Sequence, residues 1–211
     1  MKCVFLDFNG TVLDDVDLCL ELLNNMLKEK ENKMVSLEEY KEIFTFPIIN
    51  YYKASGFTFE GYTFDELADY FIIEYTRRNV LECSIFSDVK EFVDLVHNAG
   101  YKVVLCSASR IDLLLDQLND FKIRNYFDDV IGLDNHHAVS KLQLALNYIK
   151  TNQVDVNNSY FVGDTTHDFE VGNAMGTQVI LVNRGHQSSR VLNTVGAKQV
   201  STLLDAYDCL K

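Results

Sequence analysis

The sequence alternates short apolar runs with amphipathic helical patterns, and this alternation constrains the fold more than any other feature. Runs rich in Val, Ile, Leu and Phe occupy residues 2–6, 102–106, 130–133, 159–162 and 178–182. Such runs are typical of strands buried on both faces of a parallel sheet. Between them, apolar residues recur at i, i+3, i+4 and i+7 from Val89, from Ile111 and from Leu142, which predicts helices. Strands joined by helices with right-handed crossovers form an α/β fold with a doubly wound, mostly parallel sheet.

The segment between the first and second strands breaks this alternation. From about residue 15 to residue 83 it shows helical patterns and no convincing strand, with apolar stripes that begin at Val16 and at Phe64 and two shorter helices between them. Because this segment follows the first strand, its helices should lie above the carboxyl end of that strand. We therefore predict an α/β core of residues 1–14 and 84–211 that carries an all-helical cap of residues 15–83.

The charge balance excludes several classes of partner. The chain has 19 Lys and Arg residues against 31 Asp and Glu residues, for a formal charge of −12, and the resulting repulsion argues against nucleic acid or an anionic membrane as a partner. No apolar stretch approaches the roughly 20 residues of a membrane span, and the first run reaches Asp7 too soon for a signal peptide. The cysteines show no C-x-x-C pair and no metal-binding spacing, as expected of thiols in a reducing compartment. We expect a folded cytoplasmic protein.

Polar residues follow four of the predicted strands. The sequence D-F-N-G-T at residues 7–11 follows the first run, Ser107 follows the second, and Lys141 comes after the third, one turn into a helical pattern. The sequence G-D-T-T-H-D at residues 163–168 follows the fourth run. Ligands of open α/β sheets bind outside the carboxyl ends of the strands, so these residues should gather at one edge of the sheet.

Three carboxylates would converge at this edge, from Asp7, Asp164 and Asp168. Like charges this close stay ionised together only if a cation joins them. Carboxylates, carbonyl oxygens and water are ligands that suit Mg²⁺, which usually shares its coordination shell with a substrate phosphate. The sequence therefore predicts a magnesium site.

The order of these motifs resembles that of the haloacid dehalogenase (HAD) superfamily. The matching pattern is D-x-(D/N)-G-T, then Ser or Thr after a strand, then Lys, then G-D-x-x-x-D, and it extends from Asp7 to the strand at residues 178–182. The helical insertion is similar to the C1-type cap of this superfamily. The resemblance, strongest to the phosphoglycolate phosphatase-like and β-phosphoglucomutase-like branch, implies a Rossmann-like core and a small phosphorylated metabolite as the partner.

The resemblance also implies roles for individual residues. Asp7 would be the nucleophile that becomes an aspartyl-phosphate. Asp7, the backbone carbonyl of Asn9 and Asp164 would hold Mg²⁺, with support from Asp168. Ser107 would hydrogen-bond a phosphoryl oxygen, and Lys141 would neutralise charge on Asp7 and the phosphoryl group. The backbone N–H of Phe8 and the side chain of Thr11 would complete the phosphate cradle, with Gly10 and Ala108 beside them. Arg110, just past Ser107 in the sequence, is a candidate to bind an anionic group of the substrate.

Asn9 departs from the pattern of the superfamily. Most of its phosphatases carry an aspartate at this position, which protonates the leaving oxygen and then activates water. An amide forms hydrogen bonds but carries no proton at neutral pH, and general acid–base help is worth roughly 10²–10⁴-fold. Asn9 could be natural, with another group or water supplying the proton, it could be an engineered change, or the protein could bind without turnover. His167 is near enough in sequence to act as the acid, although a solvent-facing histidine is the plainer interpretation.

The leading hypothesis is a Mg²⁺-dependent phosphatase that Asn9 slows or restricts to good leaving groups. One alternative is a non-catalytic protein that binds a phosphorylated metabolite. Another is a 2-haloacid dehalogenase, which needs no metal, so that the retained Asp164 and Asp168 count against it. Either a monomer or a homodimer is compatible with the sequence. Cap residues that could read the organic end of the substrate are Tyr51, Tyr52, Lys53, Arg77 and Arg78, and the pair His136-His137 is better explained as part of a loop than as a metal site.

Overall fold

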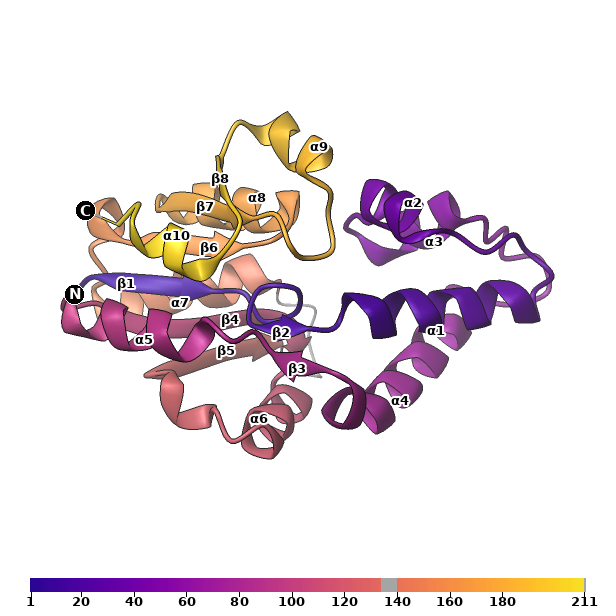
Figure 1. Cartoon of the computed structure of the whole chain (residues 1–211), viewed down its shortest axis with the longest axis horizontal. Coiled ribbons are helices and arrows are strands. Elements are labelled where there is room, and N and C mark those ends of the chain that lie inside the picture. The colour runs from indigo at the N-terminus through magenta and orange to yellow at the C-terminus, as the bar shows by residue number, and fades with distance from the viewer. Residues whose placement is uncertain (134–139, 211) are drawn as a thin grey trace.

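The computed structural model describes residues 1–133 and 140–210 of the chain. Within these residues the core is a six-stranded sheet in the order β5-β4-β1-β6-β7-β8, with neighbouring strands parallel (Figure 1). Strand β1 therefore lies between β4 and β6, and the four strands that the predicted motifs follow (β5, β4, β1 and β6) are neighbours in the sheet. The strands are β1 (Cys3–Leu6), β4 (Lys102–Arg110), β5 (Asp129–Leu133), β6 (Tyr160–Gly163), β7 (Gln178–Val182) and β8 (Lys198–Val200).

Helices cover both faces of the sheet, as the apolar runs predict. Successive side chains of a strand point to opposite faces, and in β1 Val4 and Leu6 join one hydrophobic cluster with Phe92 of α5, whereas Phe5 joins a second cluster with Ala145 of α7. Because both faces are buried, the prediction of a doubly wound α/β sheet is confirmed. The core helices are α5 (Val89–Asn98), α6 (Ile111–Asp120), α7 (Lys141–Asn152), α8 (Thr166–Met175), α9 (Ser189–Leu192) and α10 (Leu203–Tyr207).

The chain between the first and second core strands forms a helical group of its own. Its helices pack around a separate hydrophobic cluster that includes Leu22, Leu23 and Tyr40, and α2 and α4 begin with capping boxes at Ser36 and Thr63. These helices are α1 (Val16–Glu29), α2 (Leu37–Ile43), α3 (Ile48–Ser55) and α4 (Phe64–Glu82). We call this group the cap. The residue boundaries given above for core and cap remain a prediction.

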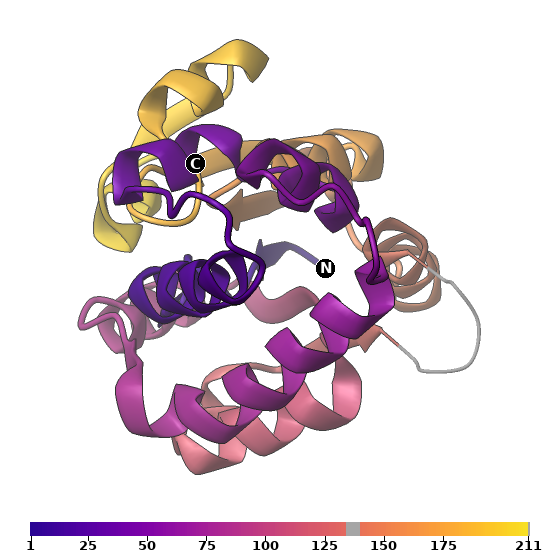
Figure 2. The same cartoon turned by 90° about the vertical axis from the view of Figure 1, so that its right-hand side faces the viewer.

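The cap lies beyond the carboxyl ends of the core strands. Figure 2, which looks along the strands from the cap side, shows α4 beside α6 and shows α2 and α3 on the side of the C-terminal segments. The chain leaves and re-enters the core through a short antiparallel pair, β2 (Leu13–Asp14) and β3 (Ser84–Ile85). No helix among the described residues is long and apolar enough to cross a membrane.

Candidate active site

The loop after β1 is shaped by close backbone approaches. The N–H of Asp7 donates to Val162 O at 2.9 Å, which continues the pairing of β1 with β6. The chain then turns at Gly10, which has a φ of +73°, and the N–H of Gly10 donates to Leu13 O. A Cβ on Gly10 would collide with the Asp164 carboxylate. Glycine is therefore required here, because it lets the loop after β1 approach the end of β6.

Lys141 joins two of the predicted carboxylates. As the first residue of α7, it donates from Nζ to Asp7 Oδ1 at 2.5 Å and to Asp168 Oδ1 at 2.7 Å. The other oxygen of Asp168 accepts from Thr165 Oγ1 and from the N–H groups of Asp164 and Thr165 at 2.7–3.2 Å. Asp168 is thus held by α8, whose capping box it completes with Thr165. This bracing fixes the Lys141 ammonium next to Asp7.

The site has more negative charge than Lys141 can balance. One oxygen of each of Asp7, Asp164 and Asp168 lies within 4.8 Å of the others. Burial and the charge of Asp168 raise the pKa of Asp7 to about 8, despite the opposing effect of Lys141. Burial also raises the pKa of Asp164 to about 6. Carboxylates that resist ionisation in this way would ionise fully beside a cation, so the donor set fits a hard divalent ion.

Ser107 lies in an irregular part of β4. The register with β5 shifts between Cys106 and Arg110, and Ser107 is buried at the edge of the cavity that also includes Ala108. Ser107 Oγ donates to Ser109 Oγ at 3.1 Å and accepts from the Ser109 N–H at 3.1 Å. Within this irregular stretch Ser109 contacts the loop after β1, because its Oγ donates to Asn9 Oδ1.

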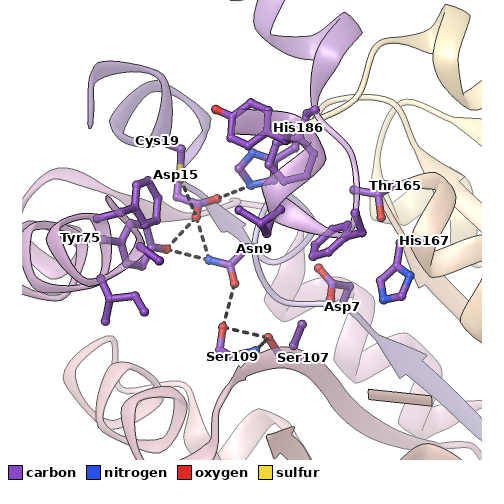
Figure 3. A pocket seen from close by; sticks show the side chains of 18 of the residues that line it. Asp7, Asn9, Asp15, Cys19, Tyr75, Ser107, Ser109, Thr165, His167 and His186 are labelled. Atoms are coloured by element: carbon purple, nitrogen blue, oxygen red, sulfur yellow. Dashed lines mark hydrogen bonds and ion pairs between the residues drawn. The ribbon is translucent and has the colours of Figure 1, made fainter. Parts of the chain in front are cut away.

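The side chain of Asn9 is held by groups that complement an amide (Figure 3). Its Nδ2 donates to Asp15 Oδ2 and to the Tyr75 hydroxyl, both at 2.7 Å, and its Oδ1 accepts from Ser109 Oγ at 3.2 Å. A carboxylate such as that of Asp15 only accepts hydrogen bonds, so an aspartate at position 9 would face it without a donor. These contacts therefore fit an asparagine, and not an aspartate, at position 9.

Asp15 and His186 form a buried ion pair behind Asn9. His186 Nε2 lies 3.2 Å from Asp15 Oδ1, and the two side chains are 5% and 1% exposed. Burial opposes both charges, but the attraction between the two groups outweighs it, raising the pKa of His186 to about 9 and lowering the pKa of Asp15. His186 Nδ1 also hydrogen-bonds with the Tyr40 hydroxyl of α2 at 2.7 Å. The cap and the core therefore meet at this ion pair.

The segment after β7 makes further contacts with the cap. Gln187 Nε2 donates to Phe44 O at 2.8 Å, the Ser188 N–H donates to Lys41 O at 3.0 Å, and Lys41 Nζ donates to Arg184 O at 3.2 Å. Together with the Tyr40–His186 contact, these bonds seat α2 on the core. They place the cap directly over the end of β1.

The residues predicted to contact the phosphate do not all lie at the cavity with a free side chain. Phe8 is buried in the core cluster below the site, and Thr11 Oγ1 donates to Asp164 Oδ1 at 2.9 Å. Arg110 lines the cavity, but its guanidinium bonds to Asp112 at 2.5 and 3.1 Å. Thr11 thus orients a candidate metal ligand, and Arg110 already has an anionic partner.

The predicted cap residues divide into two sets. Tyr51 and Tyr52 are buried and line the cavity. Lys53 is exposed, and Arg77 and Arg78 form ion pairs with glutamates on the outside of the cap. The structure therefore brings the tyrosines, and not these cations, to the cavity.

His167 lies at the cavity and not on an open surface. It lines the cavity from the first turn of α8, its ring stacks on Phe46 with a centroid separation of 4.6 Å, and its Nδ1 lies 3.5 Å from Glu170 Oε2. The pair His136-His137 lies outside the described residues.

Several residues of the site escape sequence reasoning, namely Asp15, Tyr75, Ser109 and His186. Tyr75 belongs to the apolar stripe that begins at Phe64, which marks it only as a packing position, and Asp15 lies just before the stripe that begins at Val16. A signal does exist for His186, because it follows the fifth apolar run. Polar residues that follow a strand of an open α/β sheet are candidate site residues. His186 follows β7 and would be found if this criterion were applied to that strand as well.

An α/β sheet with clustered carboxylates at the carboxyl ends of its central strands is the arrangement of an enzyme that acts on a small molecule. Residues 4–182 match the model of the haloacid dehalogenase-like hydrolase family. The chain therefore belongs to the haloacid dehalogenase-like hydrolases, as its motifs predict. No curated protein matches the chain.

Solved structures share the fold over nearly the whole length of the chain. A candidate phosphoglycolate phosphatase from Lactobacillus delbrueckii subsp. bulgaricus superposes with a TM-score of 0.81 at 17% identity, over 99% of this chain and 98% of that chain. A predicted phosphatase from Clostridium acetobutylicum gives 0.80 at 16% identity, over 99% and 97%. A haloacid dehalogenase-like family protein from Streptococcus pneumoniae gives 0.80 at 15% identity, over 99% and 98%. At these identities the likeness shows the fold.

Proposed function

We propose that the protein is a Mg²⁺-dependent phosphatase that transfers the phosphoryl group of a small compound to Asp7 and then to water. The observation that carries this proposal is the setting of Asp7, whose Oδ1 lies 2.5 Å from Lys141 Nζ. Asp7 also lies beside the carboxylate of Asp164 and lines a cavity of about 500 Å³. This arrangement provides a nucleophile, a fixed cation and room for a substrate.

The reaction takes place in two displacements at phosphorus. In the first, the Asp7 oxygen that Lys141 does not hold attacks phosphorus, and the bond from phosphorus to the leaving oxygen breaks with its electron pair. In the second, water attacks the aspartyl-phosphate, and the Asp7 carboxylate leaves. The proton lost by the water ends on the released oxygen anion through solvent, so that an alcohol or phenol and inorganic phosphate are the products.

Asp7, Asp164 and the backbone carbonyl of Asn9 would hold Mg²⁺. Both oxygens of Asp168 already accept hydrogen bonds from Lys141 and from the start of α8, so we assign Asp168 a supporting position. When bound, Mg²⁺ supplies positive charge that offsets the repulsion between the Asp7 carboxylate and the phosphoryl oxygens.

Fixed groups of the chain would stabilise the transition state. Lys141 is 3% exposed and held between two carboxylates, so it needs little reorganisation as charge moves toward the leaving oxygen. Ser107 lines the cavity, and its hydroxyl would turn from Ser109 Oγ to donate to a phosphoryl oxygen. Asn9 has no proton to transfer to the leaving oxygen, and both hydrogens of its amide are already donated to Asp15 and Tyr75.

Trapping the aspartyl-phosphate tests this function. The protein is mixed with acetyl phosphate, with and without Mg²⁺, phosphate release is followed, and quenched samples are weighed intact. We expect Mg²⁺-dependent release or a lasting phosphoryl adduct. Both should disappear in Asp7→Asn and persist in Asp14→Asn, a control at a neighbouring exposed carboxylate.

Three other outcomes would contradict the proposal. Undiminished release from the Asp7→Asn variant would remove Asp7 as the nucleophile. Tight Mg²⁺-dependent binding of phosphorylated compounds without release or adduct would indicate a binding protein. Halide release from a 2-haloacid that is insensitive to chelator would indicate a dehalogenase.

A further inference from the structure

The cavity above Asp7 is apolar on its cap side (Figure 3). Its volume of about 500 Å³ lies within the range of roughly 300–1,000 Å³ that is common for small-molecule sites. The ring of Phe71 is half-buried there, and Ile72 is 43% exposed. The cap contributes Phe44, Phe46, Ile48, Phe64, Phe71 and Ile72 to the lining. Apolar surface left uncovered next to the reacting group favours an apolar substrate moiety.

The cations at the floor of the cavity already have partners. Lys141 is bound by Asp7 and Asp168 at 2.5 and 2.7 Å. His186 is paired with Asp15 at 3.2 Å. These two residues therefore balance buried carboxylates of the site itself and provide no charge for a second anionic group of the substrate.

The cations nearer the mouth of the cavity are no better placed for this role. Arg110 is held by both oxygens of Asp112. His167 is stacked on Phe46 and lies 3.5 Å from Glu170. Among the described residues that line the cavity, every lysine, arginine and histidine thus has a partner. A substrate with a carboxylate or a second phosphate would enter without a counter-charge.

Asn9 sets an independent condition on the leaving group. Because its amide transfers no proton, Asn9 favours a leaving oxygen that can depart as an anion. A phenol ionises near pH 10, whereas an aliphatic alcohol resembles water, which ionises at about 15.7. An oxygen on an aromatic ring therefore leaves without a proton far more readily than an oxygen on an aliphatic chain.

We propose that the substrate of this site is an aryl phosphate monoester with an uncharged ring system. The ring would lie among the aromatic side chains of the cap, and the phosphate would reach Asp7. As Asp7 attacks phosphorus, the bond between phosphorus and the aryl oxygen breaks, and the electron pair remains on the phenolate. This inference rests on the proposed phosphatase function and names its substrate class.

Matched substrates separate the contributions of the ring and of the leaving group. We would measure kcat/KM with Mg²⁺ for phenyl phosphate and 1-naphthyl phosphate, whose leaving groups have similar acidity. The additional ring should raise kcat/KM by about tenfold, through apolar burial. Hexyl phosphate, which is apolar but leaves as an alkoxide, should inhibit competitively without being hydrolysed. Phosphoglycolate, which carries a carboxylate, should neither inhibit nor react at concentrations at which hexyl phosphate inhibits.

Variants in the cap test the position of the ring. Phe71→Ala should lower the ratio of kcat/KM for 1-naphthyl phosphate to kcat/KM for acetyl phosphate by about tenfold. Ile73→Ala is the matched control, because Ile73 is on the same helix but 64% exposed and outside the cavity lining. Phe46→Ala, on a different segment, should act as Phe71→Ala does. Thermal unfolding of each variant shows whether it is folded.

The outcomes distinguish this inference from the function on which it rests. No release and no phosphoryl adduct with any compound, acetyl phosphate included, would refute the phosphatase function. Release from acetyl phosphate together with a higher kcat/KM for phosphoglycolate than for 1-naphthyl phosphate would refute the aryl substrate alone. Equal effects of Phe71→Ala and Ile73→Ala would also refute it.

Discussion

Replacing Asn9 by aspartate should destabilise the protein, although it restores the usual residue of the superfamily. Asn9 Nδ2 lies 2.7 Å from Asp15 Oδ2 and donates to it. In the Asn9→Asp variant an oxygen takes the position of Nδ2, and two carboxylates face each other, one half-buried at position 9 and one buried at Asp15. The Tyr75 hydroxyl, which donates to Asp15 at 2.7 Å, cannot serve both acceptors equally well.

The distance sets the magnitude of this effect. Two unit charges 2.7 Å apart repel by about 6 kcal/mol at an effective dielectric constant of about 20. The new carboxyl group can bind a proton instead, which from a usual pKa of about 3.9 costs about 6 kcal/mol at pH 8 and about 1.5 kcal/mol at pH 5. Relaxation of the side chains makes the actual loss smaller than these upper limits. We expect a loss in unfolding free energy of about 3 kcal/mol at pH 8 and about 1 kcal/mol at pH 5.

A double-mutant cycle tests this pairing. The unfolding free energy is measured in urea at both pH values for Asn9→Asp, for Asp15→Asn and for the swap, which is the double variant that carries both substitutions. In the swap, the amide at position 15 donates to the carboxylate at position 9, so the combined loss should be smaller than the sum of the single losses by about 2 kcal/mol. Full stability of Asn9→Asp at pH 8, or additive losses in the swap, would refute the pairing of Asn9 with Asp15.

Further predictions concern the charged groups around the site. Lys141→Met leaves buried carboxylates without their cation, so we expect a loss of about 3–5 kcal/mol in unfolding free energy without Mg²⁺ and a fall in kcat of at least about 100-fold, measured by urea unfolding and steady-state kinetics. The pKa of His186, raised from 6.5 to about 9 beside Asp15, implies stability that is present in full below pH 6.5 and lost as the pH rises through 9. The unfolding free energy of the wild type should fall by up to about 3 kcal/mol between these pH values, and that of His186→Gln should fall much less. Parallel curves of unfolding free energy against pH for the two proteins would contradict this. Because the pKa values of Asp7 and Asp164 are raised to about 8 and about 6, protons compete with Mg²⁺, and calorimetry should show Mg²⁺ affinity increasing from pH 6 to pH 8.5. An affinity independent of pH would count against ligation by these carboxylates.

The sequence alone predicted the core and the centre of the site. Apolar runs and helical stripes are local patterns, and they marked five of the core strands, with β7 at its observed ends (Gln178–Val182). In a parallel sheet, residues that follow neighbouring strands must meet at one edge. For this reason the sequence groups Asp7, Lys141, Asp164 and Asp168 at one site.

The short strands were not predicted, because a few residues show no recognisable hydrophobic pattern. Strands β2 and β3 have two residues each, which is a single repeat of the alternation that identifies a strand and too short to recognise. Strand β8 (Lys198–Val200) has three residues, of which two are polar. Their pairing depends on neighbours that the folded chain supplies, so tertiary contacts decide them.

The surroundings of Asn9 were decided only by the tertiary structure. The sequence showed an unusual asparagine, but its partners come from the start of the cap at Asp15, from α4 at Tyr75 and from β4 at Ser109. His186 approaches the same carboxylate from the segment after β7. A motif fixes which residues follow a strand, because that order is local along the chain. The charges and donors that surround those residues come from distant segments, and only packing of the cap against the core brings them together.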